Sequence, residues 1–211
     1  MNWSAMGDAF PSVIAAFFKV TLVSTVVGTA VAAALGLVWA ILGRSRTRWV
    51  TVPVKVVVEF IRSTPLMIQL FALWVLLGSL PTEVIGIAML GIHFSTYMSE
   101  VYRAGIDAVP RGQWEAATAL SLPRSHTWRA VILPQAVRNV LPGLGNYAIA
   151  MFKYTPFLSV IGVGEMVRTA QDYGSNHFEY PPVFTLCGLI FLAASYPTSL
   201  AMRKLEKRLG H

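Results

Sequence analysis

The chain has 211 residues, of which 55% are hydrophobic and 13% are charged, and its formal net charge is +7. A soluble domain averages about 25% charged residues, so this chain has too little polar surface for a water-soluble globule. An ordinary cytosolic enzyme, a disordered chain and a coiled coil are therefore excluded. A disulfide scaffold is excluded as well, because Cys187 is the only cysteine. The basic residues lie in short clusters between apolar runs, so we expect no nucleic-acid partner.

The remaining class is an all-α membrane protein with about five transmembrane helices, which we predict as a single domain over residues 1–211. A span needs about 20 apolar residues, so the length allows five or six spans. The stretch Met1–Pro11 has no Lys or Arg, so we expect no signal peptide. The predicted spans are the apolar runs at about residues 20–42, 54–80, 84–101, 136–152 and 182–202.

Two apolar segments need separate comment. The first span is rich in small residues between Gly28 and Gly36, which favours close packing against another helix over simple exposure to lipid. The segment Tyr154–Gly164 is too short to cross and is predicted to dip at the outer interface. A polar loop is predicted after it, from Glu165 to Glu179.

The charges predict the orientation of the spans. Thirteen of the 17 basic residues lie in the three clusters Arg44–Lys55, Arg103–Arg138 and Arg203–Arg208. Cytoplasmic loops carry the excess of Lys and Arg, so we expect the N-terminus outside, the C-terminus in the cytoplasm, and residues 104–135 as a cytoplasmic loop. A sixth span would place the basic C-terminal tail outside, which favours five.

The cytoplasmic loop is predicted to contain two short helices. The first covers Gly112–Leu120, and the second starts at Pro123 and is stopped by Pro134. The second helix has an apolar face that includes Trp128 and Ile132. Such a helix either lies on lipid headgroups or docks in a groove of a soluble partner, and the residues alone leave both interpretations open.

The stretch from Glu115 to Pro134 resembles the EAA signature of permeases of binding-protein-dependent ABC importers. The family pattern is Glu-Ala-Ala, a glycine four residues after the second alanine, and Ile-x-Leu-Pro at the end, and Ser121 stands here at the glycine position. Further segments resemble the polar amino-acid branch of these permeases, so the resemblance covers about residues 12–205: Arg62–Leu66 with Gln69, Glu100 with Arg103, Leu141–Asn146 and Leu158–Ile161. Within that branch, residues 102–115 and 146–153 are most similar to permeases for ectoine and hydroxyectoine.

The resemblance implies the fold of a type I ABC importer permease in the cytoplasmic membrane of a bacterium. It also implies the partners: two cytoplasmic ATPase subunits, a second permease subunit of the same or a homologous chain, and an extracytoplasmic solute-binding protein. The chain has no Gly-x-x-x-x-Gly-Lys-Ser/Thr loop, so we expect no enzyme activity in this subunit and no cofactor. In this family the loop helix transmits the movement of the ATPase. The residues expected to do so here are Glu115, Ala116, Ala117, Ser121, Arg124, Trp128, Ile132, Leu133 and Pro134.

A zwitterionic solute needs partners for its carboxylate and its cation, and ionisable residues within spans are candidates. Lys153 is the candidate for the carboxylate and Glu100 the candidate for the cation. The full predicted substrate pathway is Thr64, Gln69, Tyr97, Glu100, Lys153, Tyr154 and Thr155.

These candidates have structural alternatives. Glu100 could instead pair with Arg103 on the same helix face, and Lys153 could extend to the outer headgroups. Glu59 and Arg62 are expected to form a structural pair, and His93 to be a packed polar residue between helices. No cluster has metal-ligand spacing, and no nucleophile–base pair is predicted.

Three residues depart from the family pattern. Ser121 replaces a glycine that favours a left-handed turn, so we expect a tighter turn or strain there. Tyr154 stands where the branch usually has an acid after the lysine, and Pro156 replaces a serine. Without that acid we expect a solute with a delocalised positive charge that faces an aromatic ring, such as ectoine.

Two other classes of function have requirements that can be compared with the sequence. An ion-coupled carrier that works without an ATPase would need inverted repeats and paired acids in mid-membrane. A membrane-embedded enzyme would need a reactive cluster of side chains. The sequence contains neither feature.

Overall fold

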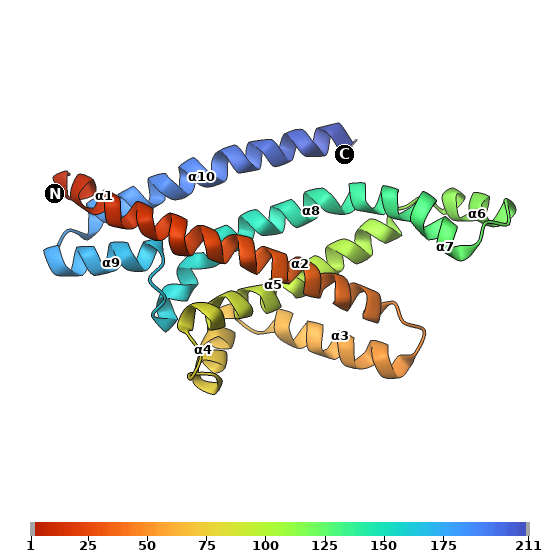
Figure 1. Cartoon of the computed structure of the whole chain (residues 1–211), viewed down its shortest axis with the longest axis horizontal. Coiled ribbons are helices and arrows are strands. Elements are labelled where there is room, and N and C mark those ends of the chain that lie inside the picture. Colours follow the sequence, from red (N-terminus) through yellow and green to blue (C-terminus); the bar gives the residue numbers. More distant parts are fainter. Residues whose placement is uncertain (1–2, 210–211) are drawn as a thin grey trace.

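The computed structural model describes residues 3–209, which form a helical bundle without β-strands (Figure 1). The longer helices are α1 (Ser4–Ala16), α2 (Val23–Gly43), α3 (Arg48–Ser63), α4 (Leu66–Leu76), α5 (Thr82–Asp107), α8 (Leu133–Tyr154), α9 (Met166–His177) and α10 (Tyr180–Leu209). The shorter elements are the helices α6 (Arg111–Ala119) and α7 (Arg124–His126), the π-helical turns η1 (Phe17–Leu22) and η2 (Thr127–Ile132), and the 3-10 helix η3 (Thr155–Ile161).

Within residues 3–209, three continuous helices are long and apolar enough to cross a membrane: Ser4–Gly43, Thr82–Asp107 and Tyr180–Leu209. Two bent pairs of helices, α3 with α4 and the helix Arg124–Ile161 with α9, would bring the number to five. The first helix runs from α1 through η1 into α2, so it begins well before residue 20.

The contact between α2 and α5 is built from small residues. The buried residues of α2 recur at every fourth position: Ser24, Gly28, Ala32, Gly36 and Ala40. A Cβ added to Gly36 would lie 2.8 Å from the carbonyl oxygen of Ser95, and one added to Gly91 would lie 2.6 Å from a methyl group of Val31. Close approach of this kind holds helices together in lipid, which agrees with the packing expected for the first span.

The predicted span at 54–80 is not one continuous helix, because the chain turns through 108° between α3 and α4. Thr64 is extended, as the residue before a proline prefers, and Pro65 has no N–H to continue the helix. The side-chain amide of Gln69 donates to the carbonyl oxygens of Ile61 (2.6 Å) and Thr64 (3.1 Å). These bonds satisfy two of the carbonyl groups that the break exposes.

The predicted polar loop at 165–179 is wrong, because Met166–His177 form the helix α9. The carboxylate of Glu165 accepts hydrogen bonds from the backbone N–H groups of Val167 (2.9 Å) and Arg168 (2.6 Å) and so caps the helix. The buried residues Met166, Ala170 and Gly174 lie one turn apart and pack with α1 and α10. A mostly polar sequence can therefore form a packed helix, because one narrow face of small and apolar residues is buried.

The predicted stop at Pro134 is the third correction, since the helix continues from η2 straight into α8. The backbone N–H of Leu133 bonds to the carbonyl of Trp128, five residues back. Pro134 is the next residue. Its missing N–H therefore coincides with the π-helical turn, where the regular i to i−4 hydrogen bonds are already interrupted, and the helix can continue. The helix that begins at Arg124 is therefore continuous with a transmembrane helix.

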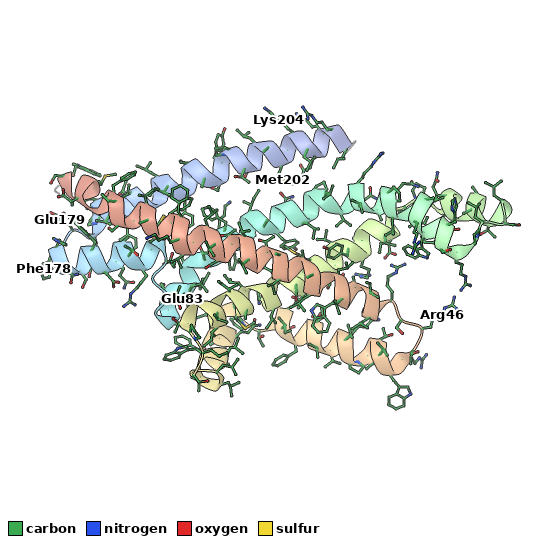
Figure 2. All side chains as sticks on the ribbon, viewed as in Figure 1. Arg46, Glu83, Phe178, Glu179, Met202 and Lys204 are labelled. Carbon is green, nitrogen blue, oxygen red and sulfur yellow. The ribbon has the colours of Figure 1, made fainter. Side chains whose placement is uncertain are left out.

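The two ends of the bundle differ. Helices α6 and α7 lie at one end, and Arg46, in the turn between α2 and α3, lies at the same end (Figures 1 and 2). The start of α1, the helix α9 and the residues Phe178 and Glu179 lie at the opposite end. Helix α10 starts at this opposite end and runs toward α6 and α7.

Candidate functional site

The first candidate site is the hairpin of α6, α7 and η2, which projects from the bundle (Figure 1). A small core of Val109, Ile132 and Ala136 holds it against α5 and α8. Trp114 and Trp128 pack edge to face, with their ring centroids 5.3 Å apart. This core gives the hairpin a fixed shape.

The residues expected to couple to an ATPase divide into two groups. Ala117 and Ile132 are buried within the hairpin, and Trp128 is half-buried. The others are exposed: Glu115, Ala116, Ser121, Arg124, Leu133 and Pro134. The side chain of Ile132 is 0% exposed and is enclosed by the hairpin core, so it supports the hairpin from within.

Ser121 ends α6 in the left-handed conformation, with φ of 52°. The N–H of Leu122 bonds to the carbonyl of Ala117 (3.0 Å), and the N–H of Ser121 bonds to that of Thr118 (2.9 Å). This pair of bonds defines a Schellman motif, whose left-handed position is usually glycine. Ser121 thus adopts the left-handed conformation that a glycine would adopt without strain.

The second candidate site is an aromatic pocket of about 160 Å³ between α5 and α8. Its lining residues are His93, Phe94, Tyr97, Tyr147, Ala150 and Tyr154. The rings contact one another, with centroids 5.4 Å apart for Phe94 and Tyr154 and 5.7 Å apart for Tyr97 and Tyr147. The pocket lies along the middle of α5 and is partly open, since its lining residue Tyr154 is 40% exposed.

A charged group adjoins the pocket through Tyr97. The guanidinium carbon of Arg62 lies 5.4 Å from the centre of the Tyr97 ring. Arg62 also faces the carboxylate of Glu100 at 3.7 Å, and Arg103 donates to the same carboxylate from Nε at 3.0 Å. The Glu100–Arg103 pair is therefore present, and Glu100 joins arginines from two helices. The predicted pair of Glu59 with Arg62 is wrong, because Arg62 extends to α5.

Glu100 also borders a second hollow, of about 570 Å³, between α2, α3 and α5. Lys55, Glu59 and Arg103 line this polar cleft as well. The oxygen of Glu59 accepts a weak hydrogen bond from Ser63 at 3.4 Å. The carboxylate of Glu100 thus stands between an aromatic pocket and a polar cleft.

Thr64 and Gln69 belong to the break between α3 and α4, and neither lines the aromatic pocket. The Thr64 hydroxyl donates to the carbonyl of Phe60 (3.0 Å). The Gln69 side-chain oxygen lies 2.9 Å from Nδ1 of His93. An amide oxygen only accepts, so Nδ1 of His93 carries the proton. His93 is a packed polar residue, as expected, and it connects the break to the pocket.

Lys153 and Thr155 lie outside the pocket. Lys153 is exposed and lines a different hollow, against α10, with Pro156 and Phe191. Thr155 is fully buried, and its hydroxyl donates to the carbonyl of Phe152 (2.8 Å). The structure therefore does not bring Lys153 and Glu100 into one cavity.

Sequence reasoning missed Arg62, Phe94, Tyr147 and Ala150 as neighbours of the site. A signal existed, because residues 93, 94 and 97 share one face of α5, and residues 147, 150 and 154 share one face of α8. Among the described residues, no group of three or more His, Cys, Asp or Glu side chains could hold a metal ion.

Comparison with known proteins gives the class of this chain. Residues 32–211 match the family model described as binding-protein-dependent transport system inner membrane component. The chain therefore belongs to this family of membrane proteins. It is a permease subunit and not an enzyme, since ATP hydrolysis in such transporters belongs to a separate ATPase subunit.

Individual relatives cover most of the chain. It is 43% identical over 193 residues to the probable amino-acid ABC transporter permease protein y4tG of Sinorhizobium fredii, which covers 90% of this chain and 84% of that protein. It is 33% identical over 215 residues to the glutamine transport system permease protein GlnP of Escherichia coli, with 99% of this chain and 97% of that protein covered.

Solved structures confirm the predicted fold. A structure described as an amino acid ABC transporter with histidines superimposes with a TM-score of 0.92 and 31% identity, covering 99% of both chains. The methionine ABC transporter MetNI, in an inward-facing conformation, gives a TM-score of 0.72 at 18% identity over 94% of both chains, which shows a shared fold alone. The chain has the fold of a type I ABC importer permease.

Proposed function

We propose that this chain imports a polar amino acid as the membrane-spanning subunit of an ATP-driven transporter. The observation that carries the proposal is the aromatic pocket between α5 and α8, with one cationic and one anionic side chain beside it. Arg62 and Glu100 offer opposite charges at 3.7 Å, and Tyr97 joins them to the pocket. This is the pattern that a zwitterion requires.

In the proposed complex the solute replaces the contact between Arg62 and Glu100. The α-carboxylate binds the planar guanidinium of Arg62, which can donate two parallel hydrogen bonds. The α-ammonium binds Glu100, whose other oxygen stays with Arg103. Arg62 thereby takes the role first assigned to Lys153. The bound amino acid thus gives Arg62 and Glu100 new partners of opposite charge, so neither side chain is left as an unpaired charge.

The aromatic pocket then receives the side chain of the solute. Tyr97 and Tyr154 line the pocket, and their aromatic rings suit a polar or delocalised cationic group. The relatives named above carry amino acid and glutamine in their names, and nothing in them supports ectoine. We therefore propose an amino acid in preference to a compatible solute.

The proposed direction of transport follows the two hollows. The solute leaves the aromatic pocket past Glu100 and enters the polar cleft lined by Lys55 and Glu59. The end of the bundle with α6 and α7 is cytoplasmic in this proposal, so the N-terminus is outside and the C-terminal end of α10 inside. The basic clusters at that end agree with the positive-inside rule.

The proposed partners are two ATPase subunits, a second permease subunit and an extracytoplasmic solute-binding protein. The exposed residues Glu115 and Leu133 contact the ATPase, and the buried residues Ala117 and Ile132 maintain the shape of the hairpin. Because η2 runs directly into α8, a movement of the hairpin would reach Tyr147 and Tyr154 through one continuous helix. An ion-coupled carrier is disfavoured because the family works with binding proteins.

The test is uptake of labelled solutes by the complete transporter in vesicles. The panel contains glutamine, arginine, cystine, ectoine and a sugar. We expect ATP-dependent uptake of at least one amino acid, and competition from others that share its α-ammonium and α-carboxylate groups. Uptake of ectoine with no competition by any amino acid would contradict the proposed substrate. Uptake without ATP would contradict the proposal that ATP hydrolysis drives transport.

A further inference from the structure

A hollow of about 350 Å³ lies between the α2–α3 turn and the hairpin of α6, α7 and η2. Arg46 lines it from the turn, and Arg124 lines it from the start of α7. The edge-to-face pair Trp114 and Trp128 forms part of its wall. Figure 2 shows Arg46 at the end of the molecule that carries α6 and α7. Two elements far apart in sequence thus contribute one arginine each to the lining of the same hollow.

These charges have no counter-ion in the described part of the chain. No acidic residue lines the hollow, and neither Arg46 nor Arg124 takes part in the ion pairs of residues 3–209. Their neighbour Arg44 differs, since it pairs with Asp107 at 2.6 Å. Two guanidinium groups that face one hollow form a site for an anion with several oxygens, and their planar donors match a phosphate group.

The helix α3, which starts just after Arg46, indicates the level of the hollow relative to the membrane. The outward residues Trp49, Val52, Val56 and Phe60 lie on one face of this helix and are 89%, 55%, 62% and 67% exposed. Such an apolar stripe suits the hydrocarbon of a bilayer. Tryptophan concentrates at the membrane–water boundary, so Trp49 at the start of the stripe marks that boundary. Arg46, three residues earlier, lies at the level of the headgroups.

We propose that this hollow binds the phosphodiester headgroup of an anionic phospholipid, with Arg46 and Arg124 as its phosphate ligands. The lipid phosphate bridges the α2–α3 turn and the hairpin, and the acyl chains run along the apolar face of α3. A bound anionic lipid would thereby fix the hairpin relative to α2.

The test measures which lipids the purified chain retains from vesicles that contain equal amounts of phosphatidylglycerol and phosphatidylcholine. Lipids that stay with the protein after detergent extraction and gel filtration are counted by mass spectrometry. We expect phosphatidylglycerol to be enriched, and Arg46→Gln to lower this enrichment about tenfold, since a charge-assisted hydrogen bond to the lipid phosphate is lost. Arg124→Gln should act in the same way, and Arg46→Lys should retain part of the enrichment.

Arg48→Gln is the matched control, because Arg48 lies in the same basic cluster but does not line the hollow. It should leave the enrichment unchanged, and all variants should elute as single symmetrical peaks. Equal enrichment in Arg46→Gln and the parent would overturn the proposal, as would an equal loss in Arg48→Gln.

Two further arms separate other anions from the lipid. Inorganic phosphate should displace no more phosphatidylglycerol than chloride of equal ionic strength does, and specific displacement would indicate a site for free phosphate instead. If Arg46→Gln weakens binding of the ATPase subunit and leaves lipid retention unchanged, the hollow receives an acidic side chain of that subunit and the proposal is wrong.

Discussion

Gly36 of α2 lies directly against the backbone of Ser95 in α5, where an added Cβ would come within 2.8 Å of the carbonyl oxygen. The side-chain hydroxyl of Ser95 also accepts a hydrogen bond from the indole N–H of Trp39 (3.0 Å). The two helices that form the centre of the bundle are therefore fixed to each other by a close contact and a polar one.

Gly36→Leu should separate these helices and lower the free energy of unfolding by about 1–3 kcal/mol, the usual effect of an overfilled contact. Thermal unfolding in detergent can be followed with a thiol-reactive dye, because Cys187 is buried and is the only cysteine. Gly7→Leu is the control, since nothing lies within 4 Å of a Cβ there. Equal unfolding midpoints for the two variants would refute the close contact.

Ser121→Gly should stabilise the end of α6. The serine holds φ of 52°, a conformation that costs a residue with a Cβ about 1 kcal/mol and a glycine much less. Hydrogen exchange of the amides at the end of α6 should slow about fivefold if the hairpin opens locally. Faster exchange in the variant would show that the serine side chain stabilises this turn by a contact of its own.

Glu100→Gln should raise the solute concentration needed for half-maximal uptake at least tenfold, because a charge-assisted hydrogen bond to the ammonium group is lost. Glu83→Gln is the matched control, since Glu83 is an exposed carboxylate on the same helix α5 that lines neither hollow. Labelled-solute uptake by the complete transporter measures both. An unchanged half-maximal concentration in Glu100→Gln would contradict the role of this carboxylate.

The orientation can be read from cysteine labelling in intact cells. A cysteine at Ser175, on the exposed side of α9, should react with a membrane-impermeant maleimide, and one at Ser125, in α7, should not. The buried Cys187 serves as an unreactive background. Labelling of Ser125→Cys alone would mean the opposite orientation.

The long helices could be predicted from apolar runs and charge clusters, but the break at Pro65 could not. Pro53 and Pro142 lie within continuous helices, so a proline alone does not mark a break. At Pro65 the side chain of Gln69 satisfies the released carbonyls, and this contact exists only in the folded chain. Helix α9 was missed because its buried face is narrow and its remaining residues are polar.

The candidate site could be predicted only in part, because it depends on how the helices pack against one another. Tyr97 and Tyr154 were placed on the substrate pathway, and both line the aromatic pocket. Lys153, next to Tyr154, points to another hollow because successive residues of a helix face different directions. The role of Arg62 depends on α3 crossing α5 near Glu100, and no local pattern in the sequence reports that crossing.

The central claim is that an ATPase drives this permease through the hairpin, and stimulated ATP hydrolysis tests it most directly. Ala117 is 3% exposed, so Ala117→Asp places a charge inside the hairpin at a cost of several kcal/mol. We predict that solute-stimulated ATP hydrolysis and uptake both fall at least tenfold while the chain still inserts into the membrane, whereas Ala119→Asp, on the exposed side of α6, retains both. Normal stimulated hydrolysis in well-inserted Ala117→Asp would contradict the claim.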